Sequence, residues 1–175
     1  DEISELNPKM QIYIQTNGTI FNDYVEKLLK NHNTYLGISI DAMHKELYEK
    51  IRKGADFHKL MDNIQKFDEI IKAKSNTINY SFNPMTINWR EIPDFIDFVN
   101  RKKSILFFNT VDFPENYSFN TLSAASLQQI MDFLYDYKPK KFSNPHFKKN
   151  NLRFQNLKTS KNSKQSIIIL QLKKE

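Results

Sequence analysis

Four short apolar segments alternate with amphipathic segments along most of this chain, and this alternation restricts the fold more than any other feature of the sequence. Each apolar segment is five to eight residues long and rich in Ile, Leu, Phe and Tyr, which is typical of a buried strand. The four predicted strands are Gln11–Gln15, Tyr35–Ile40, Thr77–Asn83 and Ser104–Val111.

Between and after these strands, apolar side chains recur with the period of an amphipathic helix. We predict helices over residues 22–31, 45–53, 56–74, 88–99 and 123–137. Asn22 and Asp56 are predicted N-caps, because a side-chain oxygen at that position accepts an otherwise unpaired N–H. Asn88 and Glu91 have the spacing of a capping box, which predicts reciprocal capping at the start of the fourth helix.

The strand and helix order β-α-β-α-β-α-β-α predicts an α/β fold with a parallel sheet, because right-handed crossovers bring successive strands side by side. The sheet is either open or curved as part of a TIM-type barrel. Four strand–helix units are half of a closed eight-unit barrel, so a curved sheet would form a partial barrel. In both arrangements the loops that follow the strands carry the functional site.

Charge divides the chain near residue 138. Residues 1–137 carry 15 Lys and Arg against 19 Asp and Glu, whereas residues 138–175 carry 11 Lys and Arg against one Glu. We therefore expect a βα domain over 1–137 and a basic tail or linker over 138–175. The tail could contact nucleic acid, but Lys and Asn are frequent throughout the chain, so a solvated linker is the favoured interpretation and nucleic-acid binding is not expected.

Several kinds of site are excluded or disfavoured. The chain has no cysteine, so it supplies no thiolate to a zinc ion or an iron–sulfur cluster. The four histidines lack the spacing of metal ligands, and the carboxylate pair Asp94 and Asp97 is predicted to face solvent.

No apolar run reaches the length of a membrane span and no signal peptide is visible, so we expect a cytoplasmic protein without membrane contact. Because the chain starts at Asp1 rather than Met, we expect it to be a fragment.

Polar and small residues lie at or just beyond the end of every predicted strand: Thr16, Asn17 and Gly18; Ser39 and Asp41; Ser81 and Asn83; Asn109, Thr110 and Asp112. Such residues usually form turns and helix caps. Because the carboxyl ends of parallel strands meet at one edge of a sheet, their shared position also predicts a ligand site there. Gly18 can adopt a positive φ or present its N–H group to a ligand.

The segments IYIQTNGTI, LGISIDAMHKELYEKIRKGADFHKLMDNI, INYSFNPMTINWREIPDFIDFV and ILFFNTVDFPENYSFNTL follow one another over about residues 12–134. In their order and spacing they resemble the middle and later part of a radical S-adenosylmethionine (radical SAM) domain, most closely the branch with SPASM or twitch extensions. The resemblance implies a partial barrel of six strand–helix units, of which this chain would hold the last four. The family's cluster-binding CxxxCxxC loop and its GGEP-like motif would then precede Asp1.

Members of that family cleave S-adenosylmethionine reductively at an iron–sulfur cluster, and the resulting deoxyadenosyl radical abstracts hydrogen from the substrate. The resemblance implies that this chain supplies part of the cofactor and substrate cavity without the cluster ligands, and is not active by itself. The implied substrate is a peptide or a small metabolite. The alternative is a non-catalytic βα binding domain whose basic tail contacts nucleic acid or a protein partner.

The family's cofactor-binding positions correspond to Thr16, Asn17, Gly18, Ser39, Asp41, Arg52 and Asn83. Ser39 matches the serine that contacts the ribose or carboxylate of the cofactor, and Asp41 follows it in the same motif, facing the substrate. Arg52 either meets the cofactor carboxylate or is a solvent-facing helical arginine. The resemblance implies that Asn83 lies near the adenosyl group.

Overall fold

The computed structural model describes residues 7, 10–138, 140 and 144–146, and most of the predicted basic tail over 138–175 lies outside these residues. Within the described residues, four parallel strands form one sheet: β1 (Ile12–Thr16), β2 (Thr34–Ser39), β3 (Asn79–Phe82) and β4 (Ile105–Phe108). The strands lie in the order β1-β2-β3-β4. The predicted α/β class with a parallel sheet is confirmed.

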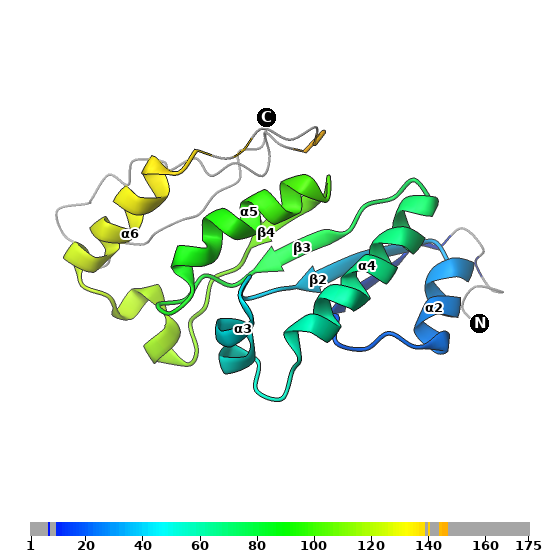
Figure 1. Cartoon of the computed structure of the whole chain (residues 1–175), viewed down its shortest axis with the longest axis horizontal. Helices are drawn as coiled ribbons and strands as arrows, with labels where there is room; N and C mark the ends of the chain where they lie inside the picture. Colours follow the sequence, from blue (N-terminus) through cyan, green and yellow to red (C-terminus); the bar gives the residue numbers. More distant parts are fainter. Residues whose placement is uncertain (1–6, 8–9, 139, 141–143, 147–175) are drawn as a thin grey trace.

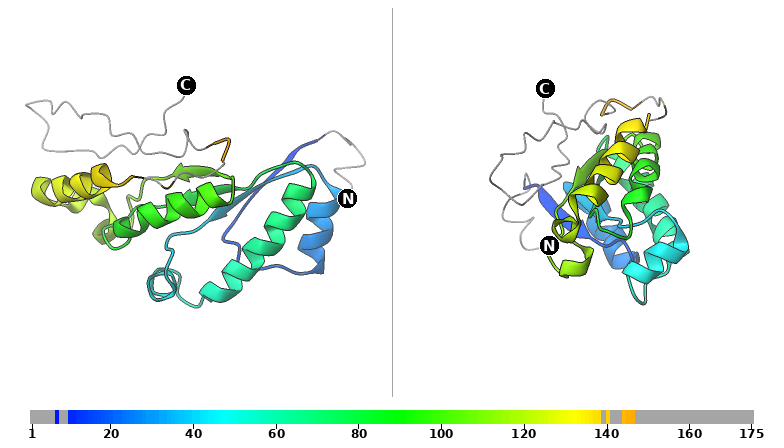
Figure 2. Two further views of the ribbon diagram at one scale, coloured as in Figure 1. Left: turned by 45° about the horizontal axis from the view of Figure 1, so that its top comes forward. Right: turned by 90° about the vertical axis from the view of Figure 1, so that its left-hand side faces the viewer.

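The helices connect and follow the strands as the periodicity predicts. They are α2 (Asp23–Asn31), α3 (Lys45–Ile51), α4 (Phe57–Ala73), α5 (Ile92–Arg101) and α6 (Ala124–Asp136), with short 3-10 turns η1 (Trp89–Glu91), η2 (Glu115–Tyr117) and η3 (Phe119–Thr121). Figures 1 and 2 show the connecting helices on one side of the sheet. Sequential parallel strands with all crossovers on one face are the arrangement of a barrel wall rather than of a doubly wound sheet. No helix in the described part is long and apolar enough to cross a bilayer.

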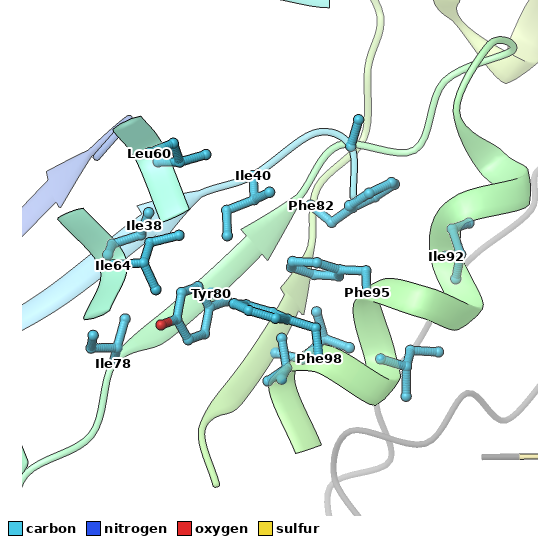
Figure 3. Packing of buried hydrophobic residues seen from close by; sticks show 14 of the residues in the cluster. Ile38, Ile40, Leu60, Ile64, Ile78, Tyr80, Phe82, Ile92, Phe95 and Phe98 are labelled. Carbon is cyan, nitrogen blue, oxygen red and sulfur yellow. The ribbon is translucent and has the colours of Figure 1, made fainter. Parts of the chain in front are cut away.

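The core lies between the sheet and these helices (Figure 3). Alternate strand residues point into it, and aromatic pairs join the sheet to α5, with ring centroids 5.4 Å apart for Tyr80 and Phe98 and 4.8 Å apart for Phe82 and Phe95. Among the described residues, no helix covers the opposite face of the sheet, which we call the helix-free face. Aromatic side chains remain accessible on it, with exposed fractions of 61% for Tyr13, 37% for Tyr35 and 46% for Phe107.

Two of the predicted helix caps are confirmed. Asn22 accepts from the Val25 N–H at 3.0 Å, and Asp56 accepts from the Lys59 N–H at 3.0 Å. The second hydrogen bond is the main cause of the lowered pKa of the exposed Asp56 carboxyl. Both bonds span three residues, which is why the local sequence predicts them.

The predicted capping box at Asn88 and Glu91 is wrong. Neither side chain caps α5, because η1 lies between Asn88 and the helix, and both side chains are buried with partners elsewhere. The helix starts at Ile92 with Pro93 in its first turn, where the missing N–H of proline costs nothing.

Asp97 was predicted to face solvent, and this is also wrong. Its side chain is buried because the chain after α6 returns along α5. Asp97 accepts from the Tyr137 hydroxyl at 2.7 Å and from the Lys140 N–H at 3.2 Å. Nearby, Asn144 donates to Asn100 at 3.0 Å, so the described residues beyond α6 are held against α5.

Candidate functional site

The carboxyl ends of β2 and β3 bring several of the predicted site residues together. Ser39 and Ser81 are register partners in the sheet, and their hydroxyl oxygens lie 2.9 Å apart. Asp41 and Asn83 follow directly beyond these two positions. Asn109, which follows β4, joins them by donating from Nδ2 to the Asn83 side-chain oxygen at 3.0 Å.

Asp41 lies at the centre of this group and is only 4% exposed. One of its oxygens, Oδ1, accepts from Asn83 Nδ2 at 2.8 Å and from the Asn83 N–H at 3.3 Å. The other, Oδ2, accepts from Arg52 Nε at 2.8 Å and lies 2.5 Å from Arg52 Nη2. Arg52, the residue directly after α3, is therefore directed at the strand ends by Asp41.

Tyr48 of α3 precedes Arg52 by one helical turn and is fully buried. Burial raises the pKa of its hydroxyl, and the Asp41 charge adds to the increase, whereas the Arg52 charge opposes it.

Asn88, which the sequence predicts as a helix cap, instead joins the ends of β2 and β3. Its side chain is fully buried and donates from Nδ2 to the backbone oxygens of Asp41 at 2.8 Å and Asn83 at 3.0 Å. Its Oδ1 accepts from the Met85 N–H at 2.6 Å. The side chain therefore replaces the backbone hydrogen bonds that end where the two strands diverge.

Glu91 holds the loop that follows β2. Its buried carboxylate accepts from the N–H of Met43, from the N–H of His44 at 3.3 Å and from His44 Nδ1 at 3.0 Å. Together, Asn88 and Glu91 attach residues 41–44 to η1. No local signal in the sequence reveals this, since both partners lie more than forty residues away along the chain.

The residues after β1 form a separate turn. Thr16 Oγ1 accepts from the Gly18 N–H at 3.1 Å, and Asn17 Oδ1 accepts from the Thr19 N–H at 3.1 Å. Gly18 has a φ of +72°, as the turn signal predicts, and its carbonyl accepts from Asn63 of α4 at 3.0 Å. The Gly18 N–H is thus engaged within the turn, and Asn17 is the exposed member of the three.

A further polar contact crosses the helix-free face of the sheet just before these strand ends. Gln15 of β1 donates from Nε2 to Ser39 Oγ at 3.0 Å and to Ser81 Oγ at 3.4 Å. Gln15 was not among the predicted site residues. Strand alternation places its side chain on the same face as Tyr13, and that periodicity is the signal that could have identified it.

The described residues contain no group of three or more His, Asp or Glu side chains placed to hold a metal ion. The chain has no cysteine, so its donor set does not fit an iron–sulfur cluster. An open groove of about 590 Å³ lies between α2 and α4 and is lined by Phe21, Glu26, Lys30 and Lys66 among others. None of the predicted site residues lines this groove, so we place the candidate site at the strand ends.

The sequence matches the family model described as the Radical SAM superfamily over residues 1–99. It is 30% identical over 95 residues to a probable GTP 3′,8-cyclase of Methanocaldococcus jannaschii, covering 54% of this chain and 31% of that protein. It is 43% identical over 56 residues to a cysteine-type anaerobic sulfatase-maturating enzyme of Clostridium novyi, covering 30% of this chain and 15% of that protein. This chain thus spans about three-tenths or less of these relatives.

The fold is similar to that of solved structures of SuiB from Streptococcus suis. The structure of SuiB bound to S-adenosylmethionine aligns with a TM-score of 0.52 and 14% identity, over 77% of this chain and 30% of SuiB. A second SuiB structure aligns with a TM-score of 0.50 over 71% of this chain and 29% of SuiB, again at 14% identity. At this identity the likeness concerns the fold, and it agrees with a partial barrel.

Proposed function

This chain belongs to the radical SAM superfamily, and we propose that it forms part of the S-adenosylmethionine and substrate cavity of a radical SAM enzyme. The superfamily uses S-adenosylmethionine together with an iron–sulfur cluster. Because the chain has no cysteine, the cluster must be held by residues other than these 175. A fragment of a longer enzyme, or a chain that works with a cluster-binding partner, satisfies this requirement.

The observation that carries the proposal is the convergence of Ser39, Asp41, Arg52 and Asn83 at the carboxyl edge of the sheet. Functional residues of a barrel fold lie at this edge. The group offers a hydroxyl, an amide and a guanidinium. S-adenosylmethionine has hydroxyl groups, a carboxylate and base nitrogen atoms, and these are the groups that such side chains bind.

We assign roles to these residues as part of the proposal. Ser39 contacts the ribose or the carboxylate, and Asn83 lies near the adenosyl group. Arg52 reaches the carboxylate through Nη1, since Nε and Nη2 are directed at Asp41. Asp41, which is buried, acts on the cavity by orienting Arg52 and Asn83.

The turn after β1 contributes chiefly through its shape. Thr16 and Gly18 bond to each other and fix the path of the chain, and the exposed Asn17 amide faces the cavity in this proposal.

When bound, S-adenosylmethionine supplies the deoxyadenosyl group that takes a hydrogen atom from the substrate. The residues of this chain bind and orient it.

Three finer features complete the proposal. Residues 1–137 form the barrel part, and residues 138–175 lead toward a C-terminal extension of the SPASM or twitch type. The substrate is a peptide or a small metabolite, because the relatives named above include both a GTP cyclase and a maturase of sulfatases. We place the enzyme in the cytoplasm. A non-catalytic binding domain is less favoured, since the family model covers β1 to β3 and most of α5.

The test is a titration of the 175-residue chain with S-adenosylmethionine, followed by backbone amide NMR. We expect weak binding, with millimolar affinity, and shifts confined to residues near Ser39, Arg52 and Asn83, because the cluster that chelates the methionine end is absent. Ser39→Ala should weaken the binding, whereas Ser126→Ala on α6 should not. Shifts located elsewhere, or submicromolar binding in calorimetry, would contradict the proposal.

A further inference from the structure

A row of hydrogen-bonded side chains crosses three neighbouring strands on the helix-free face of the sheet. It starts at Tyr13, whose hydroxyl lies 2.9 Å from Gln15 Oε1, and continues from Gln15 Nε2 to Ser39 Oγ at 3.0 Å and Ser81 Oγ at 3.4 Å. The two serine oxygens are 2.9 Å apart. The row therefore includes Ser39, the residue assigned above to the cofactor.

The orientation of the Gln15 amide follows from its neighbours. The Tyr13 hydroxyl donates to Oε1, which leaves the two Nε2 hydrogens facing the two serines. An amide nitrogen can only donate. Both serine oxygens therefore act as acceptors toward Gln15.

The direction of the bond between the two serines follows from their burial. Ser81 is 8% exposed, and among the described residues Ser39 Oγ is the acceptor within reach of its proton. Leaving a buried hydroxyl proton without an acceptor is costly, whereas the half-buried Ser39 can direct its own proton away from the sheet. Ser81 thus donates to Ser39, and Ser39 receives hydrogen bonds from both Gln15 and Ser81.

We propose that Gln15 and Ser81 are positioning residues that set the polarity of the Ser39 hydroxyl, so that Ser39 acts as a hydrogen-bond donor toward an acceptor oxygen of the ligand. The ligand group is a ribose oxygen or a carboxylate, and this inference rests on the proposed function of Ser39. With both neighbours donating to Oγ, the Ser39 proton is directed away from them, toward the open face of the sheet.

Gly37 makes this arrangement possible. It lies between Tyr13, Gln15 and Ser39 on the same face of the sheet, and Gln15 is its register partner. A Cβ at residue 37 would lie 2.0 Å from Gln15 Oε1 and 2.7 Å from the Tyr13 hydroxyl. A side chain there would displace the Gln15 amide, so the glycine provides the space through which Gln15 reaches the serines.

The first measurement needs no ligand. In the ¹H–¹⁵N spectrum of the full chain, Ser39→Ala and Ser81→Ala should each shift the Gln15 side-chain amide protons, because each removes an acceptor of one of them. Gln129, an exposed residue of α6, should be unaffected in both variants. Unchanged Gln15 amide protons in both variants would overturn the proposal.

The second measurement repeats the S-adenosylmethionine titration with two variants of Gln15. The carboxylate introduced by Gln15→Glu has only acceptors, so it takes the protons of both serines, and binding should weaken about tenfold, as in Ser39→Ala. Gln15→Met takes no proton and should weaken binding no more than about threefold. The ligand carries a net positive charge, so the added carboxylate would not by itself weaken binding.

Gln129→Glu, which adds the same charge on α6, is the matched control and should bind as the wild type does. Equal affinity of Gln15→Glu and the wild type would overturn the proposal even if the amide protons shift. If the wild-type chain shows no response to S-adenosylmethionine, the proposed function fails, and the Gln15 amide spectrum alone then decides whether the two serines accept from it.

Discussion

Arg52 bonds to a single oxygen of Asp41 through two of its nitrogens, Nε at 2.8 Å and Nη2 at 2.5 Å. The other Asp41 oxygen accepts from Asn83, so both oxygens of the buried carboxylate have donors. Because water is largely excluded from Asp41, these donors stabilise its charge. The pair joins the end of β2 to the end of α3 and fixes the direction of the guanidinium before any ligand binds.

Replacing Arg52 tests how much this pair contributes. Arg52→Gln should lower the free energy of unfolding by about 2 kcal/mol, because Asp41 stays buried without a cationic partner. This value is below that for a fully buried pair, since the Arg52 side chain is 27% exposed. Urea denaturation followed by circular dichroism measures the change.

Two further variants complete this experiment. Lys30→Gln breaks the exposed pair with Glu26 on α2 and should cost no more than about 0.5 kcal/mol. Adding Asp41→Asn to Arg52→Gln should restore part of the loss, because no buried charge remains. A double variant less stable than Arg52→Gln alone would refute this account of the pair.

Asn88 is expected to be as important for stability as the ion pair. Asn88→Ala should lower the free energy of unfolding by about 2–3 kcal/mol, because it leaves the carbonyls of Asp41 and Asn83 and the N–H of Met85 without their partner. Asn88→Asp should cost more despite its similar shape, since it places a carboxylate oxygen against two carbonyl oxygens. The measurement is again urea denaturation.

The exposed Asn116 of η2 provides the control, and Asn116→Ala should change stability by no more than about 0.5 kcal/mol. If Asn88→Asp were as stable as the wild type, Asn88 would not donate to the two carbonyls, and the described role in joining β2 to β3 would be incorrect.

The alternation of strands and helices could be predicted because it depends on local periodicity. The same holds for the caps at Asn22 and Asp56, where donor and acceptor are three residues apart. The sheet order then follows from the handedness of crossovers, and with it the meeting of polar strand ends at one edge.

The partners of these polar residues could not be predicted, because they depend on contacts between distant parts of the chain. Asn88 bonds to Asp41, 47 residues earlier, and its capping-box spacing therefore misleads. The helical pattern predicts that Asp97 is exposed. In the structure, however, Tyr137, 40 residues later, packs over it. The contact of Gln15 with Ser39 requires the strand register, which the sequence alone does not contain.

Gly18 should tolerate substitution less well than Gly54, although both have a positive φ, of +72° and +81° respectively. A Cβ at residue 18 would lie 2.8 Å from Leu60 Cδ1 and 3.1 Å from Ile38 Cγ2, whereas one at residue 54 meets nothing within 4 Å. Gly54→Ala should therefore cost only the unfavourable backbone conformation, about 1 kcal/mol. Gly18→Ala should cost about 2–3 kcal/mol, since packing strain is added.

Thermal and urea unfolding of the two alanine variants measure this difference directly. The free-energy cost of placing alanine at a positive φ is nearly the same at both positions. The difference between the two losses of stability therefore reports the contact of residue 18 with α4 and β2. Equal losses in the two variants would show that Leu60 and Ile38 move aside without cost, and that only the turn conformation requires Gly18.

Two tyrosines, the buried Tyr80 and the half-buried Tyr137, should make the protein lose stability in alkali. Burial raises the pKa of Tyr137, and its hydrogen bond to Asp97 raises it further; burial also raises the pKa of Tyr80. In the unfolded chain tyrosine ionises near pH 10, so above about pH 10 the unfolded state releases protons that the folded state retains. Their contribution to stability is therefore complete below that pH and decreases as the pH rises above it.

At neutral pH the phenylalanine variants of these tyrosines should have opposite effects. Tyr137→Phe removes a donor from the buried carboxylate of Asp97 and should cost about 1–2 kcal/mol. The Tyr80 hydroxyl is buried and has no hydrogen-bond partner among the described residues, so Tyr80→Phe should raise the free energy of unfolding by about 1 kcal/mol.

Both variants should lose less stability than the wild type between pH 9 and 11. Urea unfolding across this pH range checks both effects, and a loss of stability in Tyr80→Phe at pH 7 would show that its hydroxyl has a partner in solution.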